Sequence, residues 1–120
     1  MNHELNVKAA DGSGSFSAFI ALPENAPAPA VIVIQEIFGV NANMRNVCNN
    51  LAQAGYIAIC PDLFWRLEPD VQLDDRVDAD MQSAFGFFQK FNLDIRVSFC
   101  EMGAACHTAW TLTSRRRTRD

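Results

Sequence analysis

Long apolar stretches are missing from this 120-residue sequence. No run approaches the ~18 consecutive apolar residues of a membrane span, and the first four residues hold neither a basic segment nor an apolar core of signal-peptide length. The few cysteines lack the dense, even spacing of a secreted disulfide scaffold. We therefore predict a cytoplasmic protein that associates with no membrane. Its cysteines should be reduced thiols, of which two are small core residues, namely Cys48 and Cys60.

Basic residues are also scarce over most of the chain. The formal net charge is −4, which argues against nucleic acid as the main partner. Residues 1–94 carry twelve acidic and five basic residues, for a net charge of −7, whereas residues 95–120 carry two acidic and five basic residues, for +3. This abrupt change predicts a globular body over 1–94 and a divergent tail over 95–120. The arginines that crowd its end are Arg115, Arg116, Arg117 and Arg119.

Four consecutive β-branched residues, Val31 to Ile34, predict a strand buried on both faces, as parallel strands in α/β proteins are. The polar pair Gln35-Glu36 follows directly. Because ligands bind beyond the carboxyl ends of parallel strands, a carboxylate at this point is a candidate for chemistry. The alternative is that Glu36 only caps a loop or pairs with an arginine, and sequence position alone leaves both interpretations open.

The elements around this strand predict an α/β order. Residues 5–9 and 16–22 alternate on either side of a glycine-containing turn, which is typical of an antiparallel hairpin. A proline-rich connection over 23–29 then leads into the central strand. A helix is expected to begin near Asn41 or Asn43 and to end before Gly55. One helical face is apolar and consists of Met44, Val47, Cys48, Leu51 and Ala52.

The strand that follows, residues 57–60, completes a βαβ unit. If its later neighbours are missing, we expect this strand to present an unpaired apolar edge, which favours aggregation or dimerisation. Residues 62–80 are acidic and irregular, and residues 79–92 predict a helix whose aromatic stripe is core. The acidic residues there fit a solvated loop and a first helical turn better than a metal site; they are Asp74, Asp75, Asp78 and Asp80.

Two stretches resemble the dienelactone hydrolase family of α/β-hydrolases. They are Val31-Ile-Val-Ile-Gln-Glu-Ile-Phe-Gly-Val-Asn-Ala-Asn-Met-Arg45 and Leu51-Ala-Gln-Ala-Gly-Tyr-Ile-Ala-Ile-Cys-Pro-Asp-Leu63. The likeness covers approximately residues 5–94, and its most specific element is Gln-Glu-Ile-Phe-Gly. It implies the N-terminal half of an α/β-hydrolase fold, with an incomplete sheet.

The resemblance also implies a function, the hydrolysis of small esters or lactones by a Cys-His-Asp triad without cofactor or metal. By this likeness Glu36 contacts the nucleophilic thiol, and Ile37 donates its backbone N–H to the oxyanion hole. Phe38 and Phe88 would contact the substrate. The family binds the substrate carboxylate through an arginine, but Met81 stands at the aligned position and Arg76 precedes it, so the substrate can differ from dienelactone.

The family pattern is lost from about residue 95. Cys100 is the one echo of the nucleophile elbow, but it lacks the flanking glycines that a sharp turn needs. His3 and His107 are poorly placed for a triad, and the spacing of Cys100, Cys106 and His107 matches no common zinc site. We expect this chain alone to be inactive. The tail is interpreted as a shifted reading frame or a junction to unrelated sequence. The alternative is a non-catalytic interaction module with a basic arm.

Overall fold

A computed structural model describes residues 2–25, 27–91, 103, 107, 108 and 111 of the chain. The predicted hairpin is confirmed: β1 (Asn2–Lys8) pairs antiparallel with β2 (Ser15–Ala21) over its whole length. The proline-rich connection contains no helix or strand among its described residues and leads into β3 (Ala30–Ile32). None of the described helices is long and apolar enough to cross a membrane.

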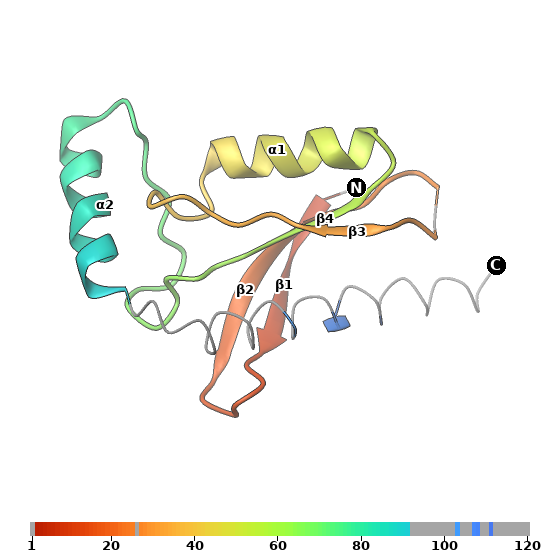
Figure 1. Cartoon of the computed structure of the whole chain (residues 1–120), viewed down its shortest axis with the longest axis horizontal. Helices are drawn as coiled ribbons and strands as arrows, with labels where there is room; N and C mark the ends of the chain where they lie inside the picture. Colours follow the sequence, from red (N-terminus) through yellow and green to blue (C-terminus); the bar gives the residue numbers. More distant parts are fainter. Residues whose placement is uncertain (1, 26, 92–102, 104–106, 109–110, 112–120) are drawn as a thin grey trace.

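The predicted βαβ unit is confirmed by β3, α1 (Ala42–Gln53) and β4 (Ile57–Pro61), whose two strands run parallel. Asn41 caps α1, because its side-chain oxygen accepts a hydrogen bond from the Met44 N–H at 3.1 Å. At the other end Gly55 has a φ of +98°, a conformation that favours glycine over residues with a Cβ. Figure 1 shows α1 lying along one face of the sheet, where it packs on β4 and β2.

The strand order of the described sheet is β1-β2-β4-β3, which corrects two expectations. The unpaired edge does not belong to residues 57–60, because β2 pairs antiparallel with β4 and places it between two neighbours. The central-strand prediction over Val31 to Ile34 is also wrong in extent and burial. Among the described residues β3 pairs only with β4, so its side chains are exposed or half-buried, and Ile34 is 59% exposed.

The core has two parts because neighbouring side chains of β4 point to opposite faces. On one face Ile57 and Ile59 pack with buried side chains of the hairpin, including Phe16 and Ile20. The other part lies under α1 and consists of Phe19, Ala21, Val40, Met44, Cys48, Ala58 and Cys60. Both predicted core cysteines are therefore confirmed as buried free thiols.

The second helix, α2 (Asp78–Lys90), follows the irregular acidic loop as predicted. Its aromatic residues behave differently from the expected core stripe. The Phe64 ring packs on those of Phe87 and Phe91, and its centroid lies 5.4 Å from the first and 5.5 Å from the second. By contrast, Phe85 is 53% exposed and Phe88 is 48% exposed. The helix is thus held through one aromatic cluster, and the prediction of a core stripe is wrong for Phe85 and Phe88.

Candidate functional site

The turn over residues 36–39 lies beyond the carboxyl end of β3 and is separated from it by residues 33–35. The Gly39 N–H donates to the Glu36 carbonyl oxygen at 3.3 Å and closes the turn. Gly39 has a φ of +79°, and a Cβ at this position would collide with the backbone carbonyl of Val71. The turn therefore requires glycine for both its conformation and the close approach of the 71–73 segment.

The 71–73 segment holds the turn from one side. The Leu73 N–H donates to the Phe38 carbonyl oxygen at 2.9 Å, and Gly39 forms a β-bridge with Gln72. The side chain of Asn41, the residue that caps α1, donates to the Leu73 carbonyl oxygen at 2.9 Å. These bonds join the turn, the 71–73 segment and the start of α1 into one unit.

Gln35 holds the same turn from the other side. Its side-chain oxygen accepts the Leu63 N–H at 2.8 Å, and its amide nitrogen donates to the Glu36 carbonyl oxygen at 3.2 Å. Leu63 belongs to the loop that follows β4. The turn after β3 is thus fixed at two places, Leu63 and residues 71–73, to the chain that follows β4, which is a rigid placement for groups that contact a ligand.

The candidate residues of this turn differ in exposure. Glu36 is exposed, and its carboxylate takes part in no ion pair or hydrogen bond with the described residues. The alternative in which Glu36 pairs with an arginine therefore finds no support in the described chain. Ile37 is half-buried, and within the same ranges its backbone N–H donates no hydrogen bond. Phe38 is buried.

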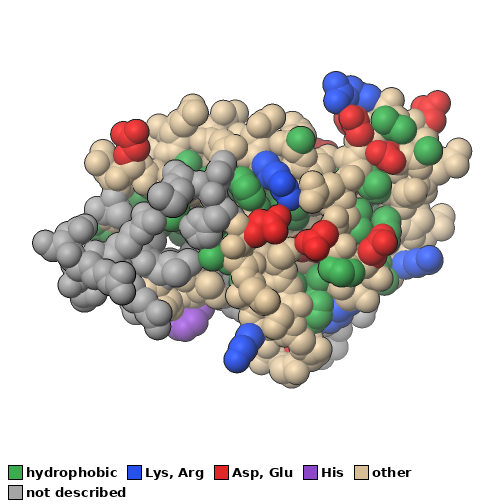
Figure 2. All heavy atoms as spheres, turned by 180° about the vertical axis from the view of Figure 1, so that it is seen from behind, with side chains coloured by type: hydrophobic (Ala, Val, Ile, Leu, Met, Phe, Trp, Pro, Cys, Tyr) green, Lys and Arg blue, Asp and Glu red, His purple; other side chains and the backbone are tan. Residues whose placement is uncertain are grey.

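Phe88 lies apart from this turn on α2, where its ring is about half exposed. Figure 2 shows hydrophobic and acidic side chains gathered at the end of the molecule that α2 and the preceding loop form. In the same region Arg76 is exposed and bound to Asp74, and Met81 is half-buried. Glu36, Ile37 and Phe38 lie together because they are consecutive in one turn. Phe88 belongs to a separate element, α2.

The acidic loop is a partly exposed segment held by its own hydrogen bonds. The Arg76 guanidinium bonds the Asp74 carboxylate at 2.9 Å, and the hydrogen bonds from Arg76 lower the pKa of Asp74 to about 2. Asp80 lies in the first turn of α2 and accepts the Asp74 N–H at 2.9 Å. Within the described residues, no three His, Cys, Asp or Glu side chains are grouped so that they could hold a metal ion.

Cys48 and Cys60 are the described thiols, and both are fully buried beneath α1. A hydrogen bond between them lowers the pKa of Cys48 and, together with burial, raises that of Cys60. Neither thiol can meet a ligand from solvent in this arrangement. Cys100 and Cys106, which the sequence grouped with His107 as a possible zinc set, lie outside the described residues, as does almost all of the 95–120 tail.

Asp62 is a polar residue whose burial the sequence did not reveal. It follows β4 and is only 3% exposed. Its carboxylate accepts the Phe64 N–H at 3.1 Å and the Asp70 N–H at 2.9 Å, which fixes the loop that carries Leu63. Burial raises the pKa of Asp62. The Pro-Asp pair at a strand end was visible in the sequence, but nothing there indicated that the carboxylate turns inward.

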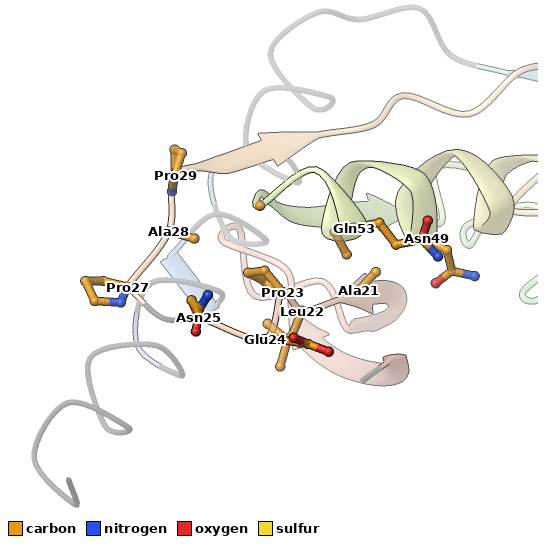
Figure 3. A pocket seen from close by; sticks show the side chains of 12 residues that line it. Ala21, Leu22, Pro23, Glu24, Asn25, Pro27, Ala28, Pro29, Asn49 and Gln53 are labelled. Carbon is orange, nitrogen blue, oxygen red and sulfur yellow. The ribbon is translucent and has the colours of Figure 1, made fainter.

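A cavity of about 720 Å³ lies outside the candidate turn. The side chains that line it come from the end of β2, the proline-rich connection and α1, as Figure 3 shows. This region adjoins the amino ends of β3 and β4, including Pro29 and Gly55. Glu36 instead follows the carboxyl end of β3, where ligands bind in parallel sheets. The cavity is therefore not the candidate site.

Comparison with known proteins shows which family the sequence resembles. The family model described as "Dienelactone hydrolase family" matches residues 16–108. A protein of Azospirillum brasilense assigned as a carboxymethylenebutenolidase is 46% identical over 94 residues, which cover 78% of this chain and 40% of that protein. The carboxymethylenebutenolidase of Pseudomonas putida is 37% identical over 97 residues, which cover 81% and 41%.

The fold is shared as well. The crystal structure of a Klebsiella pneumoniae protein assigned as a dienelactone hydrolase superposes with a TM-score of 0.51 at 33% identity. The match covers 68% of this chain and 35% of that protein. The chain thus spans about two fifths of the length of the curated relatives it matches.

Proposed function

Because this chain belongs to the dienelactone hydrolase family, we propose that it provides the Glu36-to-Gly39 half of a site that hydrolyses small carboxylic esters or lactones. The observation that carries the proposal is the turn itself. It lies beyond the carboxyl end of β3, it is held from two sides by backbone and Gln35 hydrogen bonds, and it presents an unengaged Ile37 N–H among the described residues.

The chemistry follows from what each group can donate or accept. A cysteine thiolate attacks the ester carbonyl, and the negative charge that develops on the carbonyl oxygen needs fixed N–H donors. The Ile37 N–H supplies one of them. The alcohol leaves, a thioester remains on the cysteine, and water then hydrolyses it. Glu36 would contact the thiol, and Phe38 and Phe88 would contact the apolar part of the substrate.

The nucleophile and its acid–base partners are the part that the described residues do not supply. Cys48 and Cys60 are buried between α1 and the sheet, and His107 is exposed. We therefore propose that this chain by itself does not turn over ester substrates above the buffer rate. Purified protein assayed with p-nitrophenyl acetate, beside Cys100→Ala, tests this. Turnover that disappears in Cys100→Ala would contradict the proposal.

A chimera tests the family function directly. Residues 1–94 of this chain replace the matching residues of the Pseudomonas putida relative, which supplies the remainder of its own sequence. The chimera carries Met81 at the position aligned with the arginine that binds the substrate carboxylate in the family, so it is assayed with p-nitrophenyl acetate, an ester without a carboxylate. Hydrolysis of this ester by the chimera is expected. Replacement of Glu36 by Gln should lower kcat/KM by about 100-fold if the carboxylate contacts the thiol during proton transfer.

The oxyanion role of Ile37 has its own matched pair. Ile37→Pro removes the N–H, whereas Ile37→Ala keeps it and shortens the side chain. Loss of one oxyanion donor costs about 100- to 1,000-fold in kcat, so the proline chimera should fall by that factor and the alanine chimera should not. Equal kcat values in the two chimeras would show that the N–H has no such role.

A further inference from the structure

A small enclosed site lies between the hairpin, α1 and the loop after β4. Its cavity has a volume of about 10 Å³, and the polar groups that line it include Glu4, Ser17, Arg45, Asp62 and Asp70. A volume of this size accommodates about one water molecule. The site is separate from the turn over 36–39 and takes no part in the proposed chemistry.

Arg45 supplies an unused donor to this cavity. Its Nη2 bonds Glu4 at 3.1 Å, and its guanidinium lies 5.5 Å from the centroid of the Phe19 ring. The Nε atom is buried and has no hydrogen-bond partner among the described residues. Buried donors in folded proteins are almost always paired, so an unpaired N–H on a charged group calls for a ligand.

Asp62 supplies the complementary acceptor. Each of its carboxylate oxygens accepts one backbone N–H, from Phe64 and from Asp70. A carboxylate oxygen has two acceptor positions, so each can accept one more hydrogen bond. No direct ion pair joins Arg45 and Asp62 among the described residues, although both line the same cavity.

We propose that this cavity binds one ordered water molecule, which accepts the Nε–H of Arg45 and donates to the Asp62 carboxylate. The water molecule pairs the Nε–H of Arg45 and uses one open acceptor position of Asp62. The two side chains, which form no direct ion pair, are thereby connected. Because Arg45 belongs to α1 and Asp62 follows β4, the water links the helix to the loop that carries Leu63. Glu4 extends the same network to β1.

Water-to-amide magnetisation transfer in the 15N-labelled full chain tests the proposal. The Asp70 N–H bonds the same carboxylate, so it should show a cross-peak from a water molecule that exchanges slowly with solvent. Absence of this cross-peak in the folded wild-type chain would overturn the proposal. A crystal structure with Nε bonded directly to Asp62, and no water between them, would do the same.

Two lysine substitutions provide a matched comparison. Arg66 resembles Arg45 in that it bonds a carboxylate, that of Asp11 at 3.3 Å, and lies over an aromatic ring, but it does not line the cavity. Lysine keeps the charge and lacks an Nε–H. Oxygen-17 relaxation dispersion should count one fewer long-lived water in Arg45→Lys and an unchanged number in Arg66→Lys. An unchanged number in both would refute the bridge, and if Arg45→Lys fails to fold, the wild-type cross-peak decides.

Discussion

Replacement of Gly39 by alanine should destabilise the fold more than the same change at Gly12. The two glycines have almost the same φ, +79° and +77°, but only Gly39 of the two faces another backbone, the carbonyl of Val71. A left-handed conformation costs an L-residue about 1–2 kcal/mol, and both variants incur this cost. Gly12 has open space around the added methyl group, so nothing further is lost there.

At Gly39 the 71–73 segment must also move away. That displacement breaks the Leu73-to-Phe38 hydrogen bond, which is the bond that joins the bridged pair Gly39 and Gln72. At about 1 kcal/mol for one hydrogen bond, the additional loss is about 1 kcal/mol. We therefore expect Gly39→Ala to lower the free energy of unfolding by about 2–3 kcal/mol and Gly12→Ala by about 1–2 kcal/mol.

Urea denaturation followed by tryptophan fluorescence measures both values, provided that each variant unfolds in one transition with an unchanged m value. The difference between the two variants is the informative quantity, since the conformational cost and the unfolded-state entropy cancel in it. If the two variants lose equal stability, the close approach of the 71–73 segment to the turn does not exist in solution, and the rigid placement of Glu36 and Ile37 would have to be abandoned.

Three further predictions concern the sheet edge, α2 and the acidic loop. Ile34→Lys should reduce concentration-dependent self-association through the β3 edge in analytical ultracentrifugation, because a charge blunts an exposed strand edge; Val47→Lys on α1 should not. Phe64→Ala should lower the free energy of unfolding by about 3–5 kcal/mol and speed hydrogen exchange throughout α2, and unchanged exchange would show another anchor for the helix. Arg76→Gln should return the pKa of Asp74 from about 2 toward 3.8 in an NMR titration. A carboxyl group whose pKa is lower in the folded state stabilises the fold only while it is ionised. The free energy of unfolding that the Arg76–Asp74 pair contributes in the wild-type chain should therefore decrease as the pH is lowered from 3.8 to 2. The Arg76→Gln variant should lack this pH dependence.

Local signals in the sequence predicted most of the elements. Asn41 as a cap and Gly55 as a helix terminator are chemical requirements of single positions, so they could be inferred without knowledge of the tertiary structure. The apolar face of α1 and the buried run in β4 were equally local patterns. The sequence therefore predicted the hairpin, the βαβ unit and α2 within a few residues at each end.

The errors all concern which segments become neighbours. The apolar pattern of Val31 to Ile34 indicates burial but not which strand lies beside it, so the exposure of Ile34 could not be foreseen. The position of β4 between β2 and β3 depends on long-range pairing, which carries no local signal. The same holds for the site: Glu36 could be chosen by position, whereas the inward turn of Asp62 and the closeness of Gly39 to Val71 depend on loop packing.

The central claim is that residues 1–94 form a working part of a dienelactone hydrolase site. The most direct measurement is kcat/KM for p-nitrophenyl acetate in the Pseudomonas putida chimera that carries these residues, compared with the same chimera bearing Glu36→Gln. The account predicts clear turnover by the first and a loss of about 100-fold in the second. A folded chimera without turnover, or one that is indifferent to Glu36→Gln, would contradict it.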